Sequence, residues 1–409
     1  MWKNRAGEIA MNSPNPTFTP VGQDELDWLG TDPVPVKPYY DPEWFELERE
    51  AVFRRSWQQI GHVCELPENG SFIRRDLEVL GASLLITRGK DGEIRAFHNV
   101  CTHRGTILVD EDEGKRNTFS CPYHMWTFGL DGDLISAPDF ESFHVSKAEC
   151  ALPAVACEVV GGLIFVHLGK PEGTLREWLG PYATKLEMMP VARATTFSEY
   201  VYEIDANWKL TYDNFQENYH LRFIHPSAAG PVTSPDNPFA YPTAYDFHGP
   251  HRSQRIWTKP DMDPPTGVQA IAFQRGAVQA MADGILGTET AKDYLGLFPN
   301  FFLFGSPMQH FSHTVYPIAA GKSRGVIRLY WIGEDETPSE RFAREYFMAT
   351  ARDVHTEDRA VIERGHKGLA SGALKHIHFQ TQESLCRHLF NMVAEKVEAY
   401  RSEKEGAAA

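Results

Sequence analysis

The sequence contains no long apolar run, and this argues against a membrane-spanning helix. Its longest apolar stretches, such as Gly161–Leu168, have the length of a strand, whereas a membrane helix needs about 20 apolar residues in succession. The first residues, Met1–Arg5, also lack the apolar core of a secretory signal. We therefore expect a cytoplasmic protein with no membrane partner.

An excess of positive charge is missing as well. The 409 residues include 40 Lys and Arg against 55 Asp and Glu, which gives a formal net charge of -15. Because nucleic-acid surfaces need clustered positive charge, we expect no nucleic-acid partner.

Cysteine is scarce, and six cysteines are too few for a disulfide scaffold of this length. The sequence shows no glycine-rich dinucleotide fingerprint after a strand, so NAD(P)H would have to act through a separate protein.

The pattern along the chain changes from strands to mixed elements. Asp41 and Pro42 predict the start of a helix that continues to about residue 57, because Asp is a favourable cap and Pro suits the first helical position. From about residue 70 to 168, short apolar runs and turns such as Asp131-Gly132 predict strands. Beyond them we predict a helix at 207–225, a loop at 226–265, strands at 298–331 and helices at 339–367 and 381–401.

Two short loops each carry one cysteine and one histidine. Cys101 and His103 are two residues apart, and Cys121 and His124 are three apart. Two thiolates and two imidazoles can hold one zinc ion or a [2Fe-2S] cluster. Zinc fingers usually order their ligands as two cysteines and then two histidines, whereas here each loop has a cysteine followed by a histidine. This order favours a cluster with both cysteines on one iron and both histidines on the other. The remaining interpretation is two buried cysteines with incidental histidines.

A second group of candidate ligands follows in the predicted helix at 207–225. Glu217 and His220 share one helical face because they are three residues apart. His225 lies about 140° further round an ideal helix, so it joins the same site only if the helix ends or distorts. Two histidines and one carboxylate, with open positions, form the facial triad of non-heme Fe(II) oxygenases. Alone, this spacing is equally typical of surface or core histidines.

Both groups of residues resemble motifs of one family, the Rieske non-heme iron oxygenases. Cys101–Gly105 and Cys121–His124 are similar to its Rieske motif. Asn207–Lys209, followed by Asp213–Phe215 and the Glu217–His225 pattern, is similar to its catalytic segment. The resemblance extends over roughly residues 40 to 395.

The resemblance implies two iron sites. The residues it assigns to a [2Fe-2S] Rieske cluster are Cys101, His103, Cys121 and His124, and those it assigns to a mononuclear Fe(II) are His220, His225 and Asp358. Asp358 lies in a late helix that also offers Glu357 and Asp353, and a solvated acidic helix face is the alternative interpretation. Glu217 would bridge His124 of the adjacent subunit to His220, and Asn214 would lie near the iron.

Two residues depart from the family pattern. Met125 follows the second histidine of the Rieske motif, where the family commonly has Gly. Glu217 stands where many members have Asp, and Glu occurs there in members that act on non-aromatic amines. Neither change removes a predicted ligand.

The implied fold is α+β, with an N-terminal Rieske β-domain and a START-like helix-grip catalytic domain in which helices accompany an antiparallel sheet. We predict an N-terminal arm and helix at 1–49 that packs on the catalytic domain, a Rieske domain at 50–168 and a catalytic domain at 169–409. Expected partners are a reductase that delivers electrons from NAD(P)H, with or without a ferredoxin. We expect a homotrimer, with or without a β subunit.

The implied function is that of the terminal oxygenase α subunit. We expect O2-dependent mono- or cis-dihydroxylation of an aromatic or other apolar molecule, as in aromatic hydrocarbon catabolism. The alternative within the family is a monooxygenase or oxidative O- or N-demethylase, including one for amines. An electron carrier with a ligand-binding domain is a hypothesis of a different class, and it would need the cluster but not the iron triad.

Substrate contacts are expected from apolar residues of the catalytic domain. The candidates are Phe215, Tyr219, Phe223, Phe301, Phe302, Phe304, Met308 and Phe311. His310, His313, Arg252 and Arg255 are candidates for binding an anionic group of the substrate.

Overall fold

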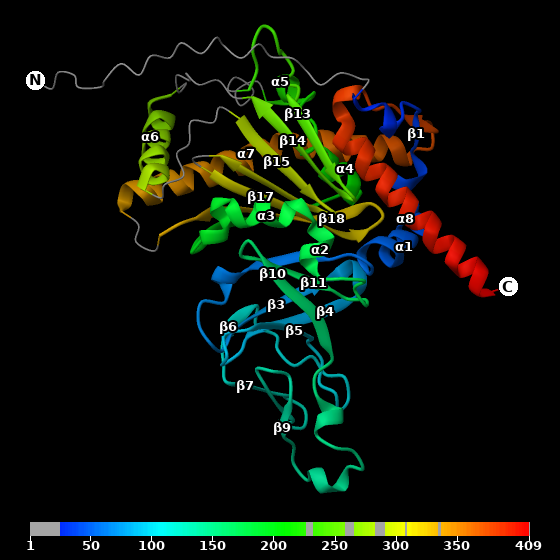
Figure 1. Ribbon diagram of the computed structural model, residues 1–409, viewed down its shortest axis with the longest axis vertical. Helices are drawn as coiled ribbons and strands as arrows, with labels where there is room; N and C mark the ends of the chain where they lie inside the picture. Colours follow the sequence, from blue (N-terminus) through cyan, green and yellow to red (C-terminus); the bar gives the residue numbers. More distant parts are fainter. Residues whose placement is uncertain are drawn as a thin grey trace, which may run out of the picture.

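The computed structural model describes residues 25–225, 232–257, 266–282, 291–306, 309–333 and 337–408. Figure 1 shows a β-rich unit below a larger unit of sheet and helices. Antiparallel sheets with helices concentrated in the second unit confirm the predicted α+β class. Among the described residues, no helix is long and apolar enough to cross a membrane.

The lower unit, here called the N-terminal β-unit, is built on a seven-stranded antiparallel sheet. Its strand order is β2-β11-β10-β5-β4-β3-β6, and a smaller sheet has the order β7-β8-β9. The strands are β2 (Gln58–His62), β3 (Ser71–Leu77), β4 (Ala82–Arg88), β5 (Ile94–His98), β6 (Glu113–Lys115), β7 (Thr118–Ser120), β8 (Thr127–Gly129), β9 (Leu134–Ser136), β10 (Ala154–Val160) and β11 (Leu163–His167). The predicted turn at Asp131-Gly132 links β8 to β9, and Gly132 has a φ of 86° that favours glycine.

The upper unit, the C-terminal unit, contains a second seven-stranded antiparallel sheet with the order β12-β18-β17-β16-β15-β14-β13. Its strands are β12 (Thr196–Ile204), β13 (Ala244–His248), β14 (His251–Trp257), β15 (Ala291–Leu297), β16 (Phe301–Ser306), β17 (Gln309–Ala319) and β18 (Lys322–Trp331). The loop predicted at 226–265 is wrong for 244–257, which form the β13–β14 hairpin at the sheet edge. Residues 226–231 and 258–265 lie outside the described residues. The hairpin depends on the pairing of β14 with β15, a contact that turn-rich local sequence does not reveal.

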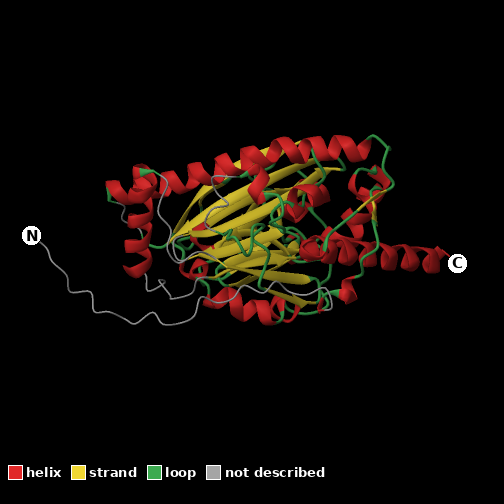
Figure 2. Ribbon diagram, turned by 90° about the horizontal axis from the view of Figure 1, so that it is seen from above, coloured by secondary structure: helices red, strands yellow, loops and turns green. Residues whose placement is uncertain are grey.

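Helices complete the C-terminal unit. They are α1 (Pro42–Glu48), α2 (Leu175–Leu179), α3 (Pro181–Met188), α4 (Trp208–Asp213), α5 (Leu221–Ile224), α6 (Gly267–Ala282), α7 (Pro338–Ala370) and α8 (Ser384–Ala408). Asp41 caps α1 as predicted, because its side chain accepts from the N–H of Glu43. Figure 2 shows a long helix running along the strands of the sheet.

The N-terminal segment joins this unit through β1 (Val34–Pro35), which pairs with β19 (His376–Ile377). The domain limits at 49/50 and 168/169 stay predictions.

A buried ion-pair network joins the two units at Glu65. The Glu65 carboxylate lies 2.7 and 3.1 Å from two guanidinium nitrogens of Arg328 on β18, and it also pairs with Arg75 on β3. Burial alone would raise the pKa of Glu65, but the charges of Arg328 and Arg75 outweigh burial and lower this pKa. The ionised carboxylate therefore connects the N-terminal β-unit to the catalytic sheet.

Removing one partner of this network should destabilise the fold. We expect Arg328→Ala to lower the free energy of unfolding by about 3–5 kcal/mol, because Glu65 stays buried with one cation fewer. The exposed pair of Arg95 and Asp91 supplies the control, since Arg95→Ala should cost less than about 1 kcal/mol. The measurement is guanidinium denaturation at neutral pH, and equal effects of the two substitutions would contradict the assignment.

The same network predicts a direction for the pH dependence of stability. Because the folded pKa of Glu65 lies below its usual value of 4.5, its contribution is complete above about pH 4.5. The contribution is lost as the pH falls through the folded pKa, so the wild type should lose more stability on acidification than Glu65→Gln does.

Candidate metal centres

The two cysteine–histidine loops share one backbone conformation. In each loop the cysteine N–H donates to the carbonyl five residues later, at 2.8 Å in both. The amide four residues after the cysteine donates back to the cysteine carbonyl, at 2.9 Å after Cys101 and 3.0 Å after Cys121. Each loop therefore forms a closed turn of the same kind.

The backbone conformation four residues after each cysteine explains why the family prefers glycine there. Gly105 has a φ of 77° in the first loop, and Met125 has a φ of 59° in the second. An L-residue in this left-handed region costs about 1–2 kcal/mol. The Met125 side chain is exposed, so the departure from glycine strains the backbone and does not disturb the buried packing.

The two predicted histidine ligands lie side by side, and so do the two predicted cysteine ligands. The rings of His103 and His124 have centroids 4.5 Å apart, and His103 stacks on Trp126 at 4.9 Å. Cys101 and Cys121 are buried, and burial together with the neighbouring Cys121 thiol raises the pKa of Cys101. Two such thiolates need a nearby cation. His103 Nδ1 is buried and has no partner among the described residues. The donor set and this unpaired nitrogen fit a [2Fe-2S] cluster.

The Asn207–Lys209 motif anchors the helix that leads to the second site. Asn207 caps α4 by accepting from the N–H of Lys209 at 3.0 Å, and its amide donates to the carbonyl of Ala320. The indole of Trp208 and the ammonium of Lys209 both bind the buried carboxylate of Glu48, at 2.8 and 2.5 Å. The start of α4 is therefore held between α1 and the sheet.

The continuous helix predicted at 207–225 is wrong. Helix α4 ends at Asp213, and α5 begins at Leu221. In between, Gln216 accepts from the buried guanidinium of Arg252, and Asn218 donates to the carbonyl of Ala240 at 3.0 Å. These tertiary hydrogen bonds compete with a regular helix. The break meets the condition under which His225 can join His220 in one site.

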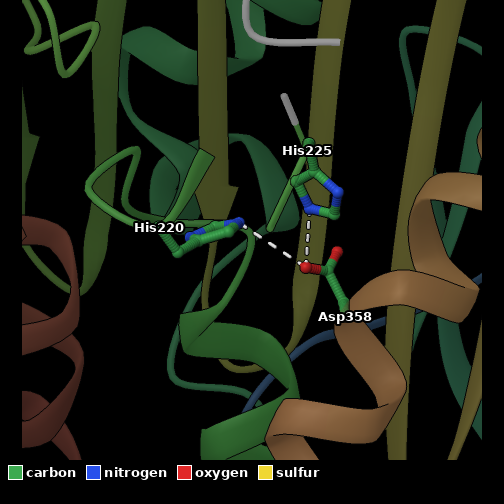
Figure 3. A group of neighbouring side chains, drawn as sticks. All are labelled: His220, His225 and Asp358. Carbon is green, nitrogen blue, oxygen red and sulfur yellow. Dashed lines mark hydrogen bonds and ion pairs between the residues drawn. The ribbon is translucent and has the colours of Figure 1, made fainter. Parts of the chain in front are cut away.

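Figure 3 shows His220, His225 and Asp358 pointing toward one another. One ligand atom from each lies within 4.8 Å of the other two. Asp358 Oδ1 is 2.7 Å from His225 Nε2 and 3.6 Å from His220 Nε2. Two imidazole nitrogens and one carboxylate oxygen on one side of a space fit a mononuclear Fe(II). That these three residues bind the iron is a proposal developed below.

Carboxylates hold the far side of both imidazoles. Glu217 contacts His220 Nδ1, and Glu357 lies 2.6 Å from His225 Nδ1. Such partners fix the orientation and tautomer of a ligating histidine. Burial lowers the pKa of His225, but the carboxylates of Asp358 and Glu357 raise it further than burial lowers it. Glu357 was a competitor for the ligand position in the sequence, and its role beside His225 was missed there.

Two other residues considered for the iron site, Asn214 and Asp353, lie in different places. Asn214 Nδ2 donates to Asp358 Oδ1 at 3.3 Å, so Asn214 lies beside the triad. Asp353 is exposed on α7, while Asp358 is buried. The acidic residues of α7 thus differ by the helix face on which they lie.

Only part of the predicted apolar contact set lies together. Phe215, Phe302, Phe304 and Phe311 form an aromatic group with centroids 5.0–6.4 Å apart in each adjoining pair. Phe301 packs instead in a separate core cluster with Phe165. Tyr219 and Phe223 are exposed, and Met308 lies outside the described residues.

Three of the four anion candidates are placed elsewhere. Arg252 is buried against Gln216 and the carbonyl of Pro250, and Arg255 pairs with Asp293. His310 alternates along β17 with Phe311 and His313 and so points to the opposite face of the sheet from His313. His313 alone contacts the aromatic group, with its ring centroid 4.2 Å from that of Phe215.

A cysteine–histidine cluster site and a two-histidine, one-carboxylate site in one chain define an oxygenase that pairs an iron–sulfur cluster with a mononuclear iron. Comparison with known families agrees with this class. Residues 56–153 match the Rieske [2Fe-2S] domain, and residues 191–399 match the catalytic domain of the ring hydroxylating alpha subunit. The chain belongs to the ring-hydroxylating alpha-subunit family of Rieske oxygenases.

Similar proteins share most of their length with this chain. The carnitine monooxygenase oxygenase subunit of Escherichia coli (strain K12) is 30% identical over 83% of this chain and 84% of its own length. The glycine betaine monooxygenase oxygenase subunit of Chromohalobacter salexigens is 32% identical over 84% and 81%. The structure of the quaternary ammonium Rieske monooxygenase CntA with an inhibitor has a TM-score of 0.75 at 23% identity, covering 93% of this chain and 99% of that one. Naphthalene 1,2-dioxygenase from Rhodococcus has a TM-score of 0.70 at 20% identity, covering 92% and 96%.

These findings confirm the expected enzyme class. The protein is the oxygenase component of a Rieske oxygenase, with a [2Fe-2S] cluster, a mononuclear iron and electrons delivered by a reductase. The hypothesis of an electron carrier is not supported, because the catalytic domain matches as well. Aromatic hydrocarbon catabolism is not supported either, because the two relatives above are named for carnitine and glycine betaine.

Proposed function

We propose that this oxygenase acts as a monooxygenase on a quaternary ammonium compound. The observation that carries the proposal is the identity of 30–32% over more than four fifths of the chain to two monooxygenase subunits named for such compounds. Glu217 supports it, since Glu stands at this position in members of the family that act on non-aromatic amines. The proposal takes up the amine alternative inferred from the sequence.

The proposed reaction inserts one oxygen atom of O2 into a C–H bond beside the quaternary nitrogen. The other oxygen atom leaves as water after taking up two electrons from the reductase and two protons. The hydroxylated carbon then breaks its bond to nitrogen and releases a tertiary amine and a carbonyl compound. The mononuclear iron supplies O2 activation at such a site, and the surrounding residues position the substrate and exclude water.

The aromatic group suits a cationic headgroup. Phe215, Phe302, Phe304 and Phe311 lie together, and Tyr294 packs on Phe304 at 5.1 Å. Quaternary ammonium groups bind to aromatic faces through cation–π attraction. Phe215 follows Asn214, which binds the Asp358 carboxylate, so the aromatic group begins beside the proposed iron.

The proposed roles of the site residues follow the family pattern. Cys101, His103, Cys121 and His124 hold the cluster, and His220, His225 and Asp358 hold the iron. Figure 1 places β7 and β9 at the far end of the lower unit from α4 and α5. We propose that electrons reach the iron from a neighbouring subunit, through Glu217.

Exposed apolar side chains near both sites support contact between copies of the chain. Tyr123 and Met125 flank His124, and Tyr219 and Phe223 follow Glu217. The rings of Tyr219 and Phe223 are adjacent, at 6.0 Å, and contiguous exposed apolar surface is a feature of protein interaction sites. A homotrimer is the assembly we propose. The ferredoxin, a β subunit and the cytoplasmic location stay predictions.

A substrate panel tests the proposed function. The purified protein, a reductase and NADH would be incubated with carnitine, glycine betaine and naphthalene under labelled O2. We expect a tertiary amine from a quaternary substrate, with kcat/KM at least about tenfold above that for naphthalene, read by mass spectrometry. A naphthalene diol without any amine product would overturn the proposal.

A further inference from the structure

Three buried polar side chains lie together beside the iron triad. They are Tyr202 on β12, His313 on β17 and His355 on α7, here called the Tyr202–His313–His355 cluster. The Tyr202 hydroxyl is 2.6 Å from His313 Nε2, and the Tyr202 and His355 rings have centroids 3.7 Å apart. All three side chains are at most 5% exposed. No part of the proposed reaction has used them so far.

The cluster contains buried nitrogen atoms without partners. Among the described residues, nothing hydrogen-bonds to His313 Nδ1 or to either ring nitrogen of His355. Buried polar groups in folded proteins are nearly always paired. Three unpaired nitrogens in one cluster are therefore available to bind the polar atoms of a ligand.

The position of the cluster links it to the reaction site. His355 precedes Asp358 by three residues on α7, so the two side chains share one helical face. The His313 ring lies against Phe215, at the start of the aromatic group. A small substrate held between the iron and the aromatic group would therefore lie next to the cluster.

Gly325 allows the side chain of Tyr202 to reach His313 across the sheet. Strand β18 lies between β12 and β17, and its Gly325 pairs with Tyr202 on one side and Val315 on the other. A Cβ atom at Gly325 would overlap the ring and the hydroxyl group of Tyr202. Because Gly325 has no side chain, the Tyr202 ring can lie across β18.

The hydrogen bond between Tyr202 and His313 makes two of the three free nitrogens donors. If the Tyr202 hydroxyl donates to His313 Nε2, the proton of His313 resides on Nδ1, which is then the one unpaired group of this pair. The opposite assignment would leave both the Tyr202 proton and His313 Nδ1 unpaired. Neutral His355 has one N–H to donate, and its other nitrogen only accepts. Two N–H groups without acceptors suit the two oxygens of a carboxylate.

Both imidazoles are neutral at physiological pH. Burial lowers the pKa of His313 well below its usual value and that of His355 to about 4. The charge of Asp358 raises the pKa of His355 and that of Arg359 lowers it, so burial decides the direction. The cluster would bind an anion by hydrogen bonds and not by an ion pair.

We propose that the Tyr202–His313–His355 cluster binds the carboxylate of a zwitterionic quaternary amine and so directs its ammonium end toward the iron. The inference rests on the proposed function and adds a substrate requirement to it. His313 and His355 donate to the carboxylate oxygens, and Tyr202 is a positioning residue that sets the tautomer of His313.

Calorimetric titration of the iron-loaded enzyme tests this inference without turnover. Glycine betaine and carnitine carry a carboxylate, whereas choline has the same trimethylammonium group and no carboxylate. We expect the wild type to prefer the two carboxylates over choline. His313→Phe and His355→Phe should weaken binding of the carboxylates by about tenfold to hundredfold and change choline binding by less than about threefold.

A matched control and a milder variant accompany these substitutions. His366→Phe removes another imidazole of α7 outside the cluster and should leave all three affinities unchanged. Tyr202→Phe keeps the ring and should weaken carboxylate binding by a smaller factor. Only the hydrogen bond that sets the tautomer of His313 is lost, and the His313 imidazole remains. Retained iron and sulfide content shows that each variant is folded.

The outcomes separate the two proposals. If the wild type binds no quaternary amine, the proposed function fails, and this inference fails with it. If the wild type binds glycine betaine or carnitine, and the histidine variants bind them equally well, only the inference about the cluster is overturned. Equal losses for choline and the carboxylates would also overturn it, since they would show a general effect on the site.

Discussion

Replacing His220 with Ala is expected to remove the mononuclear iron and to lower product formation to less than about one hundredth of the wild-type rate. His220 supplies one of the two imidazoles that form the candidate metal group with Asp358 among the described residues, and loss even of a residue that supports a metal ligand typically costs 10–100-fold in affinity or activity. Iron should fall from about three to about two per chain, with about two sulfides retained. Elemental analysis, sulfide assay and the visible spectrum measure these quantities.

The control for this substitution is His366→Ala on α7, which lies outside the three-residue metal group. It should keep both iron sites and full turnover. Unchanged turnover in His220→Ala would contradict the assignment of the triad. Loss of sulfide together with iron would show a disrupted fold, and the comparison would then be repeated with Asp358→Asn, which alters the charge of the third ligand and little of its volume.

In protein whose two iron sites have both been loaded, Glu217→Gln should slow turnover about a hundredfold. Glu217 contacts His220 Nδ1 and also accepts from the N–H of His220 at 3.2 Å. The amide keeps the shape of the side chain and removes the charge that orients the imidazole and, in our proposal, bridges to the neighbouring subunit. Stopped-flow reoxidation of the reduced cluster, with substrate and O2 present, is the measurement.

Glu357→Gln is the matched comparison, because Glu357 contacts His225 Nδ1 in the same manner. It should weaken iron binding by about 10–100-fold, but in iron-loaded protein the cluster should reoxidise at the wild-type rate. If both variants slow reoxidation equally, Glu217 has no special part in electron transfer. If neither does, the bridge is absent.

The cluster loops could be predicted from the sequence because their geometry is local. Cys101 and Cys121 each close a turn within five residues, so the spacing of cysteine and histidine already contains the ligand arrangement. The same local rule explains Met125, whose departure from glycine was visible in the sequence. Only its φ of 59° shows that the substitution strains the backbone.

The iron site could be predicted only in part. The three-residue spacing predicted that Glu217 lies beside His220, and the two side chains do meet, although the helix assumed for them is absent because α4 ends at Asp213 and α5 begins at Leu221. The break that brings His225 near His220 depends on Arg252 and on the carbonyl of Ala240, which bind Gln216 and Asn218 from other parts of the chain. Choosing Asp358 over Asp353 needed the family resemblance, and the reason for the choice, the buried face of α7, is a property of the packing.

The sequence by itself determined the donor types, their local spacing and hence the chemistry of two iron sites, because such features lie within a few residues of one another. The tertiary structure decided which distant groups meet. Glu65 faces Arg328, Glu357 faces His225, and Tyr202 reaches His313 across Gly325. Each of these contacts joins residues more than 100 positions apart, and its geometry is set by strand register and helix packing, which no local pattern encodes.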